Sequence, residues 1–399
     1  MNALLNRLMT GTNLDAGEKY VQRCRSCGQE HAGFSTKCRK CNGAIDVFYD
    51  LSRVQLKKSE NTYRRYFDIL PVKDEKNLKW LGDGGTPLIH SKKIGKKLGL
   101  KNLYLKYEGA NPTNSTKDRM ATVSLSYLFE NGIFEFALSS TGNTGTSYAY
   151  GVTKYPEFKM HLIYHGSPRR LNFRLRDNIR TYKISGDFVK ACSVANSFAV
   201  ANKITAEGGF FNPGRREGLK MAFAEAAEQM KTSPDWYFQA TSSSMGVVGT
   251  HKAACELREL GLVDKIPKLG CIQQDTCNPM VLAWRENSES IKQHHLFENP
   301  RGIAKAILRG NPVNTYPIIR ELVIDTGGKM ESVNRTAIIR AMHMLREENL
   351  ACCPASGVAL AGLVKMRQAG EIDADEVVMV NLTGGIRPKT VYPRQFIPL

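Results

Sequence analysis

A lysine with the potential for covalent chemistry stands at position 117. It follows a turn-forming run, residues 111–114, and precedes a helix-like segment, residues 120–127. Ser115 or Thr116 can cap that helix, which places Lys117 at a positive helix N-terminus where the ammonium form is penalised. A lysine made neutral in this way is a nucleophile that forms a Schiff base with an aldehyde. A solvated lysine in a surface helix is the alternative, and the other motifs decide between the two.

Four cysteines have the spacing of a zinc ribbon. Cys24 and Cys27 form one C-x2-C pair, and Cys38 and Cys41 form a second. Each pair makes a tight knuckle, and four thiolates complete a tetrahedral zinc site that leaves no position open for catalysis. We therefore predict a structural zinc, or a ribbon that has kept its fold. The other six of the ten cysteines have no ligand spacing and are expected to be buried, unpaired residues.

Three loops have the chemistry of anion binding, and each follows a short apolar strand. They are residues 139–147, 241–250 and 382–385, which are rich in Gly, Ser and Thr. Such loops expose backbone amides and hydroxyls that bind phosphate or carboxylate groups. The expected strands are residues 103–108, 136–138, 160–164, 236–240, 270–273 and 377–382; residues 188–204 are an expected helix and 44–80 connecting structure. This order predicts an α/β fold with parallel sheets, whose ligands bind at the carboxyl ends of the strands.

The composition narrows the class of partner. There are 56 basic and 38 acidic residues, a net charge of +18, which suggests an anionic partner. That partner could be nucleic acid, a membrane surface or a phosphorylated small molecule. The basic residues are scattered along the chain, which is more typical of a solvated surface than of a nucleic-acid groove. No apolar run is long enough for a membrane helix, and residues 1–17 have no signal-peptide pattern. We expect a cytoplasmic protein.

Several motifs occur in an order that resembles a known family. They are residues 84–88, 111–119, 140–145, 242–249, 354–357 and 382–385. They resemble threonine synthase and its relatives, cysteate synthase and the cysteine synthases, which are pyridoxal-phosphate enzymes of the tryptophan-synthase-β fold type. The N-terminal ribbon also resembles that of some threonine synthase-like proteins. The resemblance covers roughly residues 20–399.

The resemblance implies a domain organisation. Two parallel-sheet lobes of the tryptophan-synthase-β-like fold would follow an N-terminal segment, residues 1–50, that carries the zinc ribbon. The enzyme body would be residues 51–399, with a small lobe of approximately residues 110–210 inserted in a larger lobe formed by 51–109 and 211–399. A homodimer is the assembly that the family leads us to expect.

The resemblance also implies which residues bind pyridoxal 5′-phosphate. Lys117 would bind the cofactor covalently and later serve as the general base. Asn143 would hydrogen-bond the 3′-oxygen of the cofactor, and Thr383 would meet its pyridine nitrogen. The cofactor phosphate would be held by Ser242, Ser243, Ser244, Met245 and Gly246.

Another set of residues would bind the substrate. Ser140, Thr141 and Thr144 would bind its carboxylate. The pair Arg215 and Arg216, or alternatively Arg119, is a candidate for binding a phosphate leaving group. For this arginine pair, a solvated helix face is the alternative.

The reaction implied is that of a carbon–oxygen lyase acting on phosphates: O-phosphohomoserine and water would give threonine and phosphate. Three departures from the family pattern leave the reaction open: Asn114 stands where glycine is common, Thr116 where phenylalanine is usual, and Cys353 where an acid is frequent. They fit equally a β-replacement on O-phosphoserine, as in a cysteate, cysteine or diaminopropionate synthase. Two other classes remain: a nucleic-acid-binding ribbon protein with an inactive enzyme body, and a sensor that binds the cofactor without turnover.

Overall fold

The structure is a computed structural model of the 399-residue chain, and it describes residues 14, 17–140, 142–387, 391–393 and 396–398. The chain divides into two compact units. The first unit contains residues 1–85, 117–221 and 389–399, and the second contains residues 86–116 and 222–388. Both units contain a mainly parallel sheet with helices packed on it, so the predicted α/β class is confirmed.

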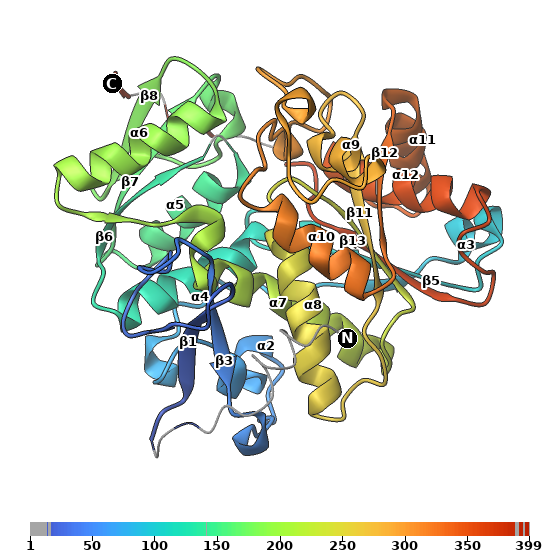
Figure 1. Cartoon of the computed structure of the whole chain (residues 1–399), viewed down its shortest axis with the longest axis horizontal. Helices are drawn as coiled ribbons and strands as arrows, with labels where there is room; N and C mark the ends of the chain where they lie inside the picture. Colours follow the sequence, from blue (N-terminus) through green and yellow to red (C-terminus); the bar gives the residue numbers. More distant parts are fainter. Residues whose placement is uncertain (1–13, 15–16, 141, 388–390, 394–395, 399) are drawn as a thin grey trace. The chain divides into compact units, whose positions relative to one another are not determined.

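The first unit begins with a small antiparallel sheet in the strand order β2-β1-β3. Its strands are β1 (Tyr20–Cys24), β2 (Glu30–His31) and β3 (Ile45–Tyr49). Figure 1 shows β1 and β3 side by side, and Tyr20 pairs with Tyr49 in their register. The expectation of connecting structure over residues 44–80 is wrong for β3, since all five of its residues are buried in the ribbon.

Buried polar contacts join β3 to helix α7 (Pro213–Met230), which begins in the first unit. The guanidinium of Arg216 donates to the Ile45 carbonyl and, over 2.9 Å, to the Asp46 carboxylate. The hydroxyl of Tyr49 donates to the Glu217 carboxylate over 2.8 Å. The ribbon and the start of α7 are therefore one packed structure.

A five-stranded parallel sheet forms the rest of the first unit, in the order β14-β8-β7-β6-β9. The strands are β6 (Glu135–Ser139), β7 (Lys159–His165), β8 (Ile179–Ile184), β9 (Thr205–Ala206) and β14 (Ile397–Pro398). The helices are α2 (Thr62–Arg65), α4 (Lys117–Glu130), α5 (Asn143–Lys154) and α6 (Phe188–Ala201). Helices α4 and α5 pack on each other, while α6 lies along β6 and β7 (Figure 1).

The second unit contains a six-stranded sheet in the order β12-β11-β10-β13-β5-β4, which is parallel except for β4. The strands are β4 (Leu88–His90), β5 (Asn102–Tyr107), β10 (Trp236–Ala240), β11 (Lys268–Gln274), β12 (Lys329–Val333) and β13 (Val377–Leu382). The helices are α3 (Lys92–Leu98), α8 (Met245–Glu259), α9 (Pro279–Arg285), α10 (Tyr316–Asp325), α11 (Arg335–Glu347) and α12 (Pro354–Gln368). Helix α12 packs across β10, β11 and β13, and its Leu360 lies in a buried core with Phe238 and Val380.

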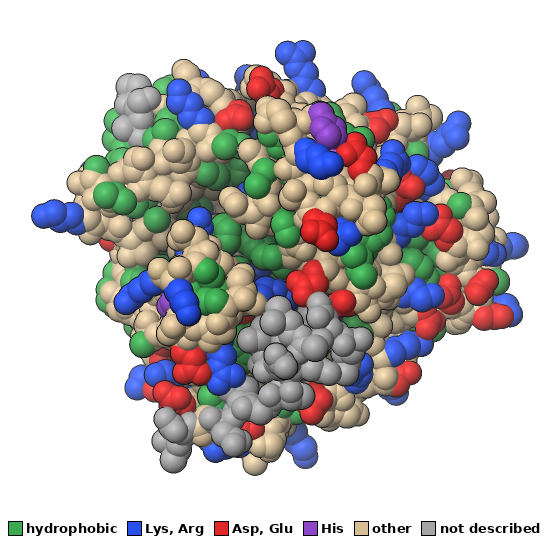
Figure 2. Space-filling model, in the orientation of Figure 1, with side chains coloured by type: hydrophobic (Ala, Val, Ile, Leu, Met, Phe, Trp, Pro, Cys, Tyr) green, Lys and Arg blue, Asp and Glu red, His purple; other side chains and the backbone are tan. Residues whose placement is uncertain are grey.

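The surface does not concentrate positive charge on the face that Figure 2 shows. Lysine and arginine side chains are scattered there among acidic ones. This distribution agrees with the scattered basic residues of the sequence. Within the described residues, no helix combines the length and the apolar character needed to cross a bilayer.

Candidate active site

Lys117 is the first residue of α4 and is half-buried. Burial lowers the pKa of Lys117 to about 8, and the positive charge of Arg215 contributes to the lowering. The expected direction of the shift is confirmed, but its causes are burial and a neighbouring cation. More of this amine is therefore neutral near pH 7 than of an ordinary lysine, and the neutral form is the one that acts as a nucleophile or a base.

The residues just before Lys117 are fixed within the second unit. The Thr116 amide donates to the Thr383 carbonyl over 3.0 Å, and Ser115 forms an antiparallel bridge with Gly384. The Gly385 amide donates to the Asn114 carbonyl over 2.9 Å. The approach to Lys117 is thus hydrogen-bonded to the segment that follows β13.

Asn114 has a left-handed backbone conformation, with φ of 60°. Asparagine adopts this region more readily than other residues with a side chain, and glycine adopts it most readily. The Asn114 side chain also donates to the Gly109 carbonyl over 3.0 Å. These two facts explain why asparagine stands where the family commonly has glycine.

The loop between β6 and α5 is organised by Ser140. Its buried hydroxyl accepts hydrogen bonds from the amides of Gly142, over 3.3 Å, and Gly145, over 2.9 Å. A hydroxyl that accepts two bonds keeps its hydrogen to donate. Asn143 and Thr144 follow in the first turn of α5 and are half-buried. Thr141 lies outside the described residues.

The loop between β10 and α8 contains the five residues predicted to hold a phosphate. Ser244 precedes α8 with φ of 60°, and Met245 and Gly246 form its first turn, where amides lack acceptors within the helix. A Cβ on Gly246 would lie 2.6 Å from Nε2 of Gln239, so a larger residue there would require the Gln239 side chain to move. Ser242 and Ser243 are half-buried.

Thr383 lies at the same edge of the second unit's sheet as this loop. It directly follows β13, and β13 pairs in parallel with β10. The carboxyl ends of neighbouring parallel strands are where ligands bind in such sheets. Helix amides and hydroxyls of this kind suit a phosphate, and a lysine with a lowered pKa suits an aldehyde. These residue types fit pyridoxal phosphate.

The two candidate arginines have internal partners instead of a solvated face. Arg215 is buried, and its Nε donates to Glu207 over 2.6 Å while its Nη2 donates to the other carboxylate oxygen. Arg216 is buried too and donates to Asp46 and to the Ile45 and Phe210 carbonyls. The alternative of a solvated helix face is therefore wrong, since both arginines are buried and paired with carboxylates. Their role toward a substrate phosphate stays a prediction.

Sequence reasoning missed the polar network around Arg215. Its members are Ser124, Tyr148, Glu207 and Asn212, which come from separate parts of the first unit and are all buried. A buried acid cannot be told from a surface acid by residue type alone. The signal that was available is the closeness of Glu207, Asn212 and Arg215 in the sequence, where an acid precedes two potential donors in one Gly-containing stretch.

The four ribbon cysteines gather at one point. Cys24 and Cys41 are separated by 3.4 Å between their sulfurs, and Cys27 lies 3.6 Å from Cys38 and 3.4 Å from Cys41. These separations exceed a disulfide bond of about 2.05 Å and approach the ~3.8 Å between thiolates of a tetrahedral zinc site. The cluster is compatible with a zinc ribbon.

The remaining cysteines are free, and four of the six are buried, as expected. The exceptions are Cys192 and Cys353, which are half-buried. Cys353 faces the segment after β13, since a Cβ on Gly384 would lie 3.2 Å from its sulfur.

A second group that could hold a metal is formed by Glu286, His294 and His295. The Lys292 amide donates to Nδ1 of His295 over 3.0 Å, so the hydrogen of the neutral ring lies on Nε2. That nitrogen points at the Glu286 carboxylate, 2.9 Å away. The group is satisfied as a hydrogen-bonded cluster without a metal.

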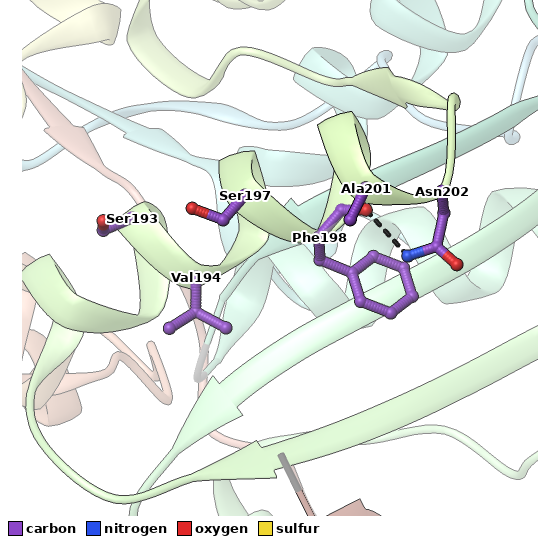
Figure 3. A pocket seen from close by; sticks show the side chains of 6 residues that line it. All are labelled: Ser193, Val194, Ser197, Phe198, Ala201 and Asn202. Carbon is purple, nitrogen blue, oxygen red and sulfur yellow. Dashed lines mark hydrogen bonds between the residues drawn. The ribbon is translucent and has the colours of Figure 1, made fainter.

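A hollow lies on one side of α6, lined by Ser193, Val194, Ser197, Phe198, Ala201 and Asn202 (Figure 3). None of these residues is among the predicted site residues, and none has a titratable side chain. The Asn202 side chain is engaged with the Phe198 carbonyl over 2.8 Å. This hollow does not have the groups that catalysis requires.

Comparison with known proteins agrees with these features. Residues 79–384 match the model of the pyridoxal-phosphate dependent enzyme family. A threonine synthase from Methanocaldococcus jannaschii is 33% identical over 377 residues, which cover 91% of this chain and 92% of that protein. A cysteate synthase from Methanosarcina acetivorans is 27% identical over 388 residues, 92% of each chain.

Solved structures share the fold. The processed form of threonine deaminase isoform 2 from Solanum lycopersicum superposes with a TM-score of 0.62 and 16% identity, covering 80% of this chain and 92% of the other. The family match spans the loops, Lys117 and Thr383 described above. The chain belongs to the pyridoxal-phosphate dependent enzyme family and is a threonine synthase-like member of fold type II.

Proposed function

We propose that this protein eliminates phosphate from a phosphorylated amino acid, acting as a threonine synthase on O-phosphohomoserine. The observation that carries the proposal is Lys117, a half-buried lysine of lowered pKa at the start of α4, in a chain whose relatives include threonine synthases. The products would be threonine and inorganic phosphate.

The proposed roles follow the chemistry of each loop. Lys117 binds the cofactor covalently, Asn143 donates to its 3′-oxygen, and Thr383 meets its ring nitrogen. The amides and hydroxyls of the loop from Ser242 to Gly246 hold its phosphate, since a helix N-terminus favours an anion. Bound pyridoxal phosphate would withdraw electrons from the substrate's α-carbon and make the hydrogen there acidic.

The chain's own groups would do the rest. Ser140 and Thr144 would orient the substrate by its carboxylate. Lys117, when its amine is neutral, would take the proton from the α-carbon and return it later, which is general acid–base catalysis. A hydroxyl at Thr383, where other pyridoxal enzymes have an aspartate, would leave the ring nitrogen largely unprotonated.

A β-replacement on O-phosphoserine is the second candidate. Two observations favour it: cysteate synthases match more than nine-tenths of the chain, and the charge of Arg215 is paired with Glu207. A chain whose buried arginine is already paired has one cation fewer for a distant phosphate. The shorter substrate keeps its phosphate closer to the carboxylate-binding loop.

One assay separates these reactions. The purified chain, loaded with pyridoxal phosphate, is given O-phosphohomoserine or O-phosphoserine, with water, sulfite, sulfide or an amine as acceptor. Release of inorganic phosphate is measured and the amino-acid product is identified by mass spectrometry. We expect phosphate release from O-phosphohomoserine with water. Lys117→Ala should lose both the phosphate release and the visible absorption of the bound cofactor. No release from either substrate would refute the proposed substrates.

We also propose that the ribbon cysteines bind one structural zinc ion. The support is the four sulfurs, which lie within 4.8 Å of one another, and the two knuckles, in which the Gly28 and Asn42 amides donate to the carbonyls of Cys24 and Cys38 over 2.9 Å. Elemental analysis should find about one zinc per chain. Cys38→Ser should lose it, whereas Cys271→Ser should keep it. Zinc-free protein with an intact fold would contradict the proposal.

A further inference from the structure

Glu207, which follows β9, is the centre of a buried network in the first unit. It is 1% exposed. One of its carboxylate oxygens accepts from Nε of Arg215 over 2.6 Å and from the Asn212 side chain over 2.8 Å, and lies 2.5 Å from the Tyr148 hydroxyl. The other accepts from Nη2 of Arg215 and from the Gly209 amide, the latter over 3.0 Å. A carboxylate with so many donors is held in a single orientation.

This carboxylate fixes the Arg215 side chain. Two parallel N–H donors on two oxygens form the fork geometry that sets the plane of a guanidinium as well as its position. The guanidinium carbon also lies 5.2 Å from the centre of the Tyr148 ring. Arg215 is 4% exposed, so its charge acts on the groups inside the first unit.

The backbone brings this arginine against α4. A Cβ on Gly214 would lie 3.0 Å from the Ser124 Cα, and a Cβ on Gly218 would lie 2.2 Å from the Arg119 carbonyl. The two glycines therefore let the start of α7 pack directly on α4. Arg215 directly follows Gly214 in the first turn of α7, and α4 begins with Lys117.

We propose that Glu207 is a positioning residue that holds Arg215 against α4 and, through it, sets how much of the Lys117 amine is neutral. The inference rests on the proposed role of Lys117 as the cofactor-binding lysine. It assigns to this network a task in the chemistry, because only the neutral amine can bond to an aldehyde or accept a proton.

Electrostatics support this assignment. The pKa of Lys117 is lowered by burial and by Arg215. Burial is the largest influence on the pKa of Arg215 and lowers it, but the charges and hydrogen bonds of Glu207 and Tyr148 together outweigh burial and raise that pKa. From α5, Tyr148 also faces the pair, and burial with the charge of Glu207 raises its pKa well above the usual value, so it stays neutral. Lys117 is the group in this set that titrates near neutral pH.

The test measures Lys117 directly, without cofactor or substrate. The full-length, cofactor-free chain is acetylated with acetic anhydride at a series of pH values, and the rate at Lys117 is followed by mass spectrometry. The rate tracks the neutral fraction of the amine. In Glu207→Gln, the charge of Arg215 is no longer compensated, so the midpoint should fall by roughly one pH unit.

A paired replacement gives the opposite sign. In the double variant Glu207→Leu with Arg215→Met, the cation itself is absent, so the midpoint at Lys117 should rise towards that of an ordinary lysine. Removing both charges of a buried pair leaves no unpaired ion, which keeps the double variant foldable. If Glu207→Gln does not fold, the double variant decides alone.

Glu225→Gln is the matched control, since it breaks a buried ion pair with Lys106 in the second unit. It should leave the midpoint at Lys117 unchanged. An unchanged midpoint in the folded Glu207 variants, or a shift in the same direction in both, would overturn the inference. Failure of phosphate release would refute the proposed substrates instead, because labelling needs neither substrate nor turnover.

Discussion

Each unit contains a buried ion pair, and the two are built in opposite ways. In the second unit, the Lys106 ammonium gathers the acceptors: Glu225 over 2.6 Å, Gln229 over 2.7 Å and the Thr86 carbonyl over 2.7 Å. In the first unit, the Glu207 carboxylate gathers the donors, and Arg215 is one of them. The side chains of Lys106 and Glu225 are 0% and 7% exposed, and those of Arg215 and Glu207 are 5% and 0% exposed.

The Lys106–Glu225 pair stabilises a segment of the backbone, whereas the Arg215–Glu207 pair influences a third charged group, Lys117. Glu225 also accepts from the Thr86 amide over 2.9 Å, and Glu108 accepts from the Thr86 hydroxyl over 2.8 Å. The Lys106 pair thus fixes the chain just before β4. The charge of Arg215, by contrast, lowers the pKa of Lys117. Burial of an ion pair does not by itself indicate its role, because the desolvation cost and the Coulomb attraction nearly cancel. The role depends on the groups that surround the pair.

The largest effect should come from Lys106→Met. This change leaves Glu225 buried without its cation, which costs about 3–5 kcal/mol in free energy of unfolding. Urea denaturation followed by circular dichroism measures it. Lys97→Met is the control, since Lys97 pairs with Glu347 on the surface with both side chains about half exposed, and its midpoint should not move. A Lys106 variant as stable as this control would remove the basis of the comparison.

Glu207→Gln and Glu225→Gln compare the pairs through the same chemical change. We expect Glu207→Gln to cost about 2–4 kcal/mol, because six donor groups lose a charged acceptor. Glu225→Gln should cost less, because Lys106 keeps the Thr86 carbonyl and Gln229. Matched urea titrations provide both values. If Glu225→Gln costs more than Glu207→Gln, then Lys106 depends more on its charged partner than the donors around Glu207 depend on theirs.

Lys117→Met tests the pH dependence that follows from the lowered pKa. The folded chain releases the Lys117 proton near pH 8, whereas a lysine in the unfolded chain has a pKa of about 10.5. The unfolded chain therefore binds more protons between these values, and the stability of the cofactor-free wild type rises through that window. The variant has no such dependence, so its advantage over the wild type should shrink by about 2 kcal/mol between pH 8 and pH 10.5. The free energy of unfolding of both proteins is measured against pH. Parallel curves would show that the pKa of Lys117 is not lowered.

The smallest effect distinguishes a charged acceptor from a neutral one. Tyr148→Phe removes a hydroxyl that lies 2.5 Å from the Glu207 carboxylate, and Tyr237→Phe removes one that donates to the Gln239 amide oxygen over 2.6 Å. A hydrogen bond to a charged group contributes about 1.5–3 kcal/mol and a neutral one about 0.5–1.5 kcal/mol. The Tyr148 variant should therefore unfold at lower urea than the Tyr237 variant. Equal midpoints would argue against a charge-assisted hydrogen bond between Tyr148 and Glu207.

Local patterns were enough to predict much of this structure. The spacing of the cysteines predicted their cluster, and the expected strands correspond to β5, β6, β7, β10, β11 and β13. The helix after the Asn111 turn was expected from its capping residues, and α4 starts there. Each of these features is contained within a short stretch of chain, so residue type and order suffice.

Charged strands and distant partners escaped prediction. Strand β8 contains Arg180 and Lys183, which interrupt its apolar pattern, although it lies between two other strands of its sheet. Arg215 and Arg216 looked equivalent, yet successive helical residues point about 100° apart, and they reach different acids. Asp46 stands 170 positions from Arg216. No local pattern records a contact made over such a separation.

The contacts between β3 and α7 have a consequence for how this chain can be cut or recombined. Arg216 depends on Asp46 and the Ile45 carbonyl, and Glu217 accepts from Tyr49. A shortened gene that starts after residue 50 would leave this buried guanidinium without its carboxylate and with the Phe210 carbonyl as its remaining acceptor among those described here, whether or not zinc matters to the fold. The ribbon is thus no detachable appendage. Exchanging it for that of a relative should require exchanging the start of α7 with it.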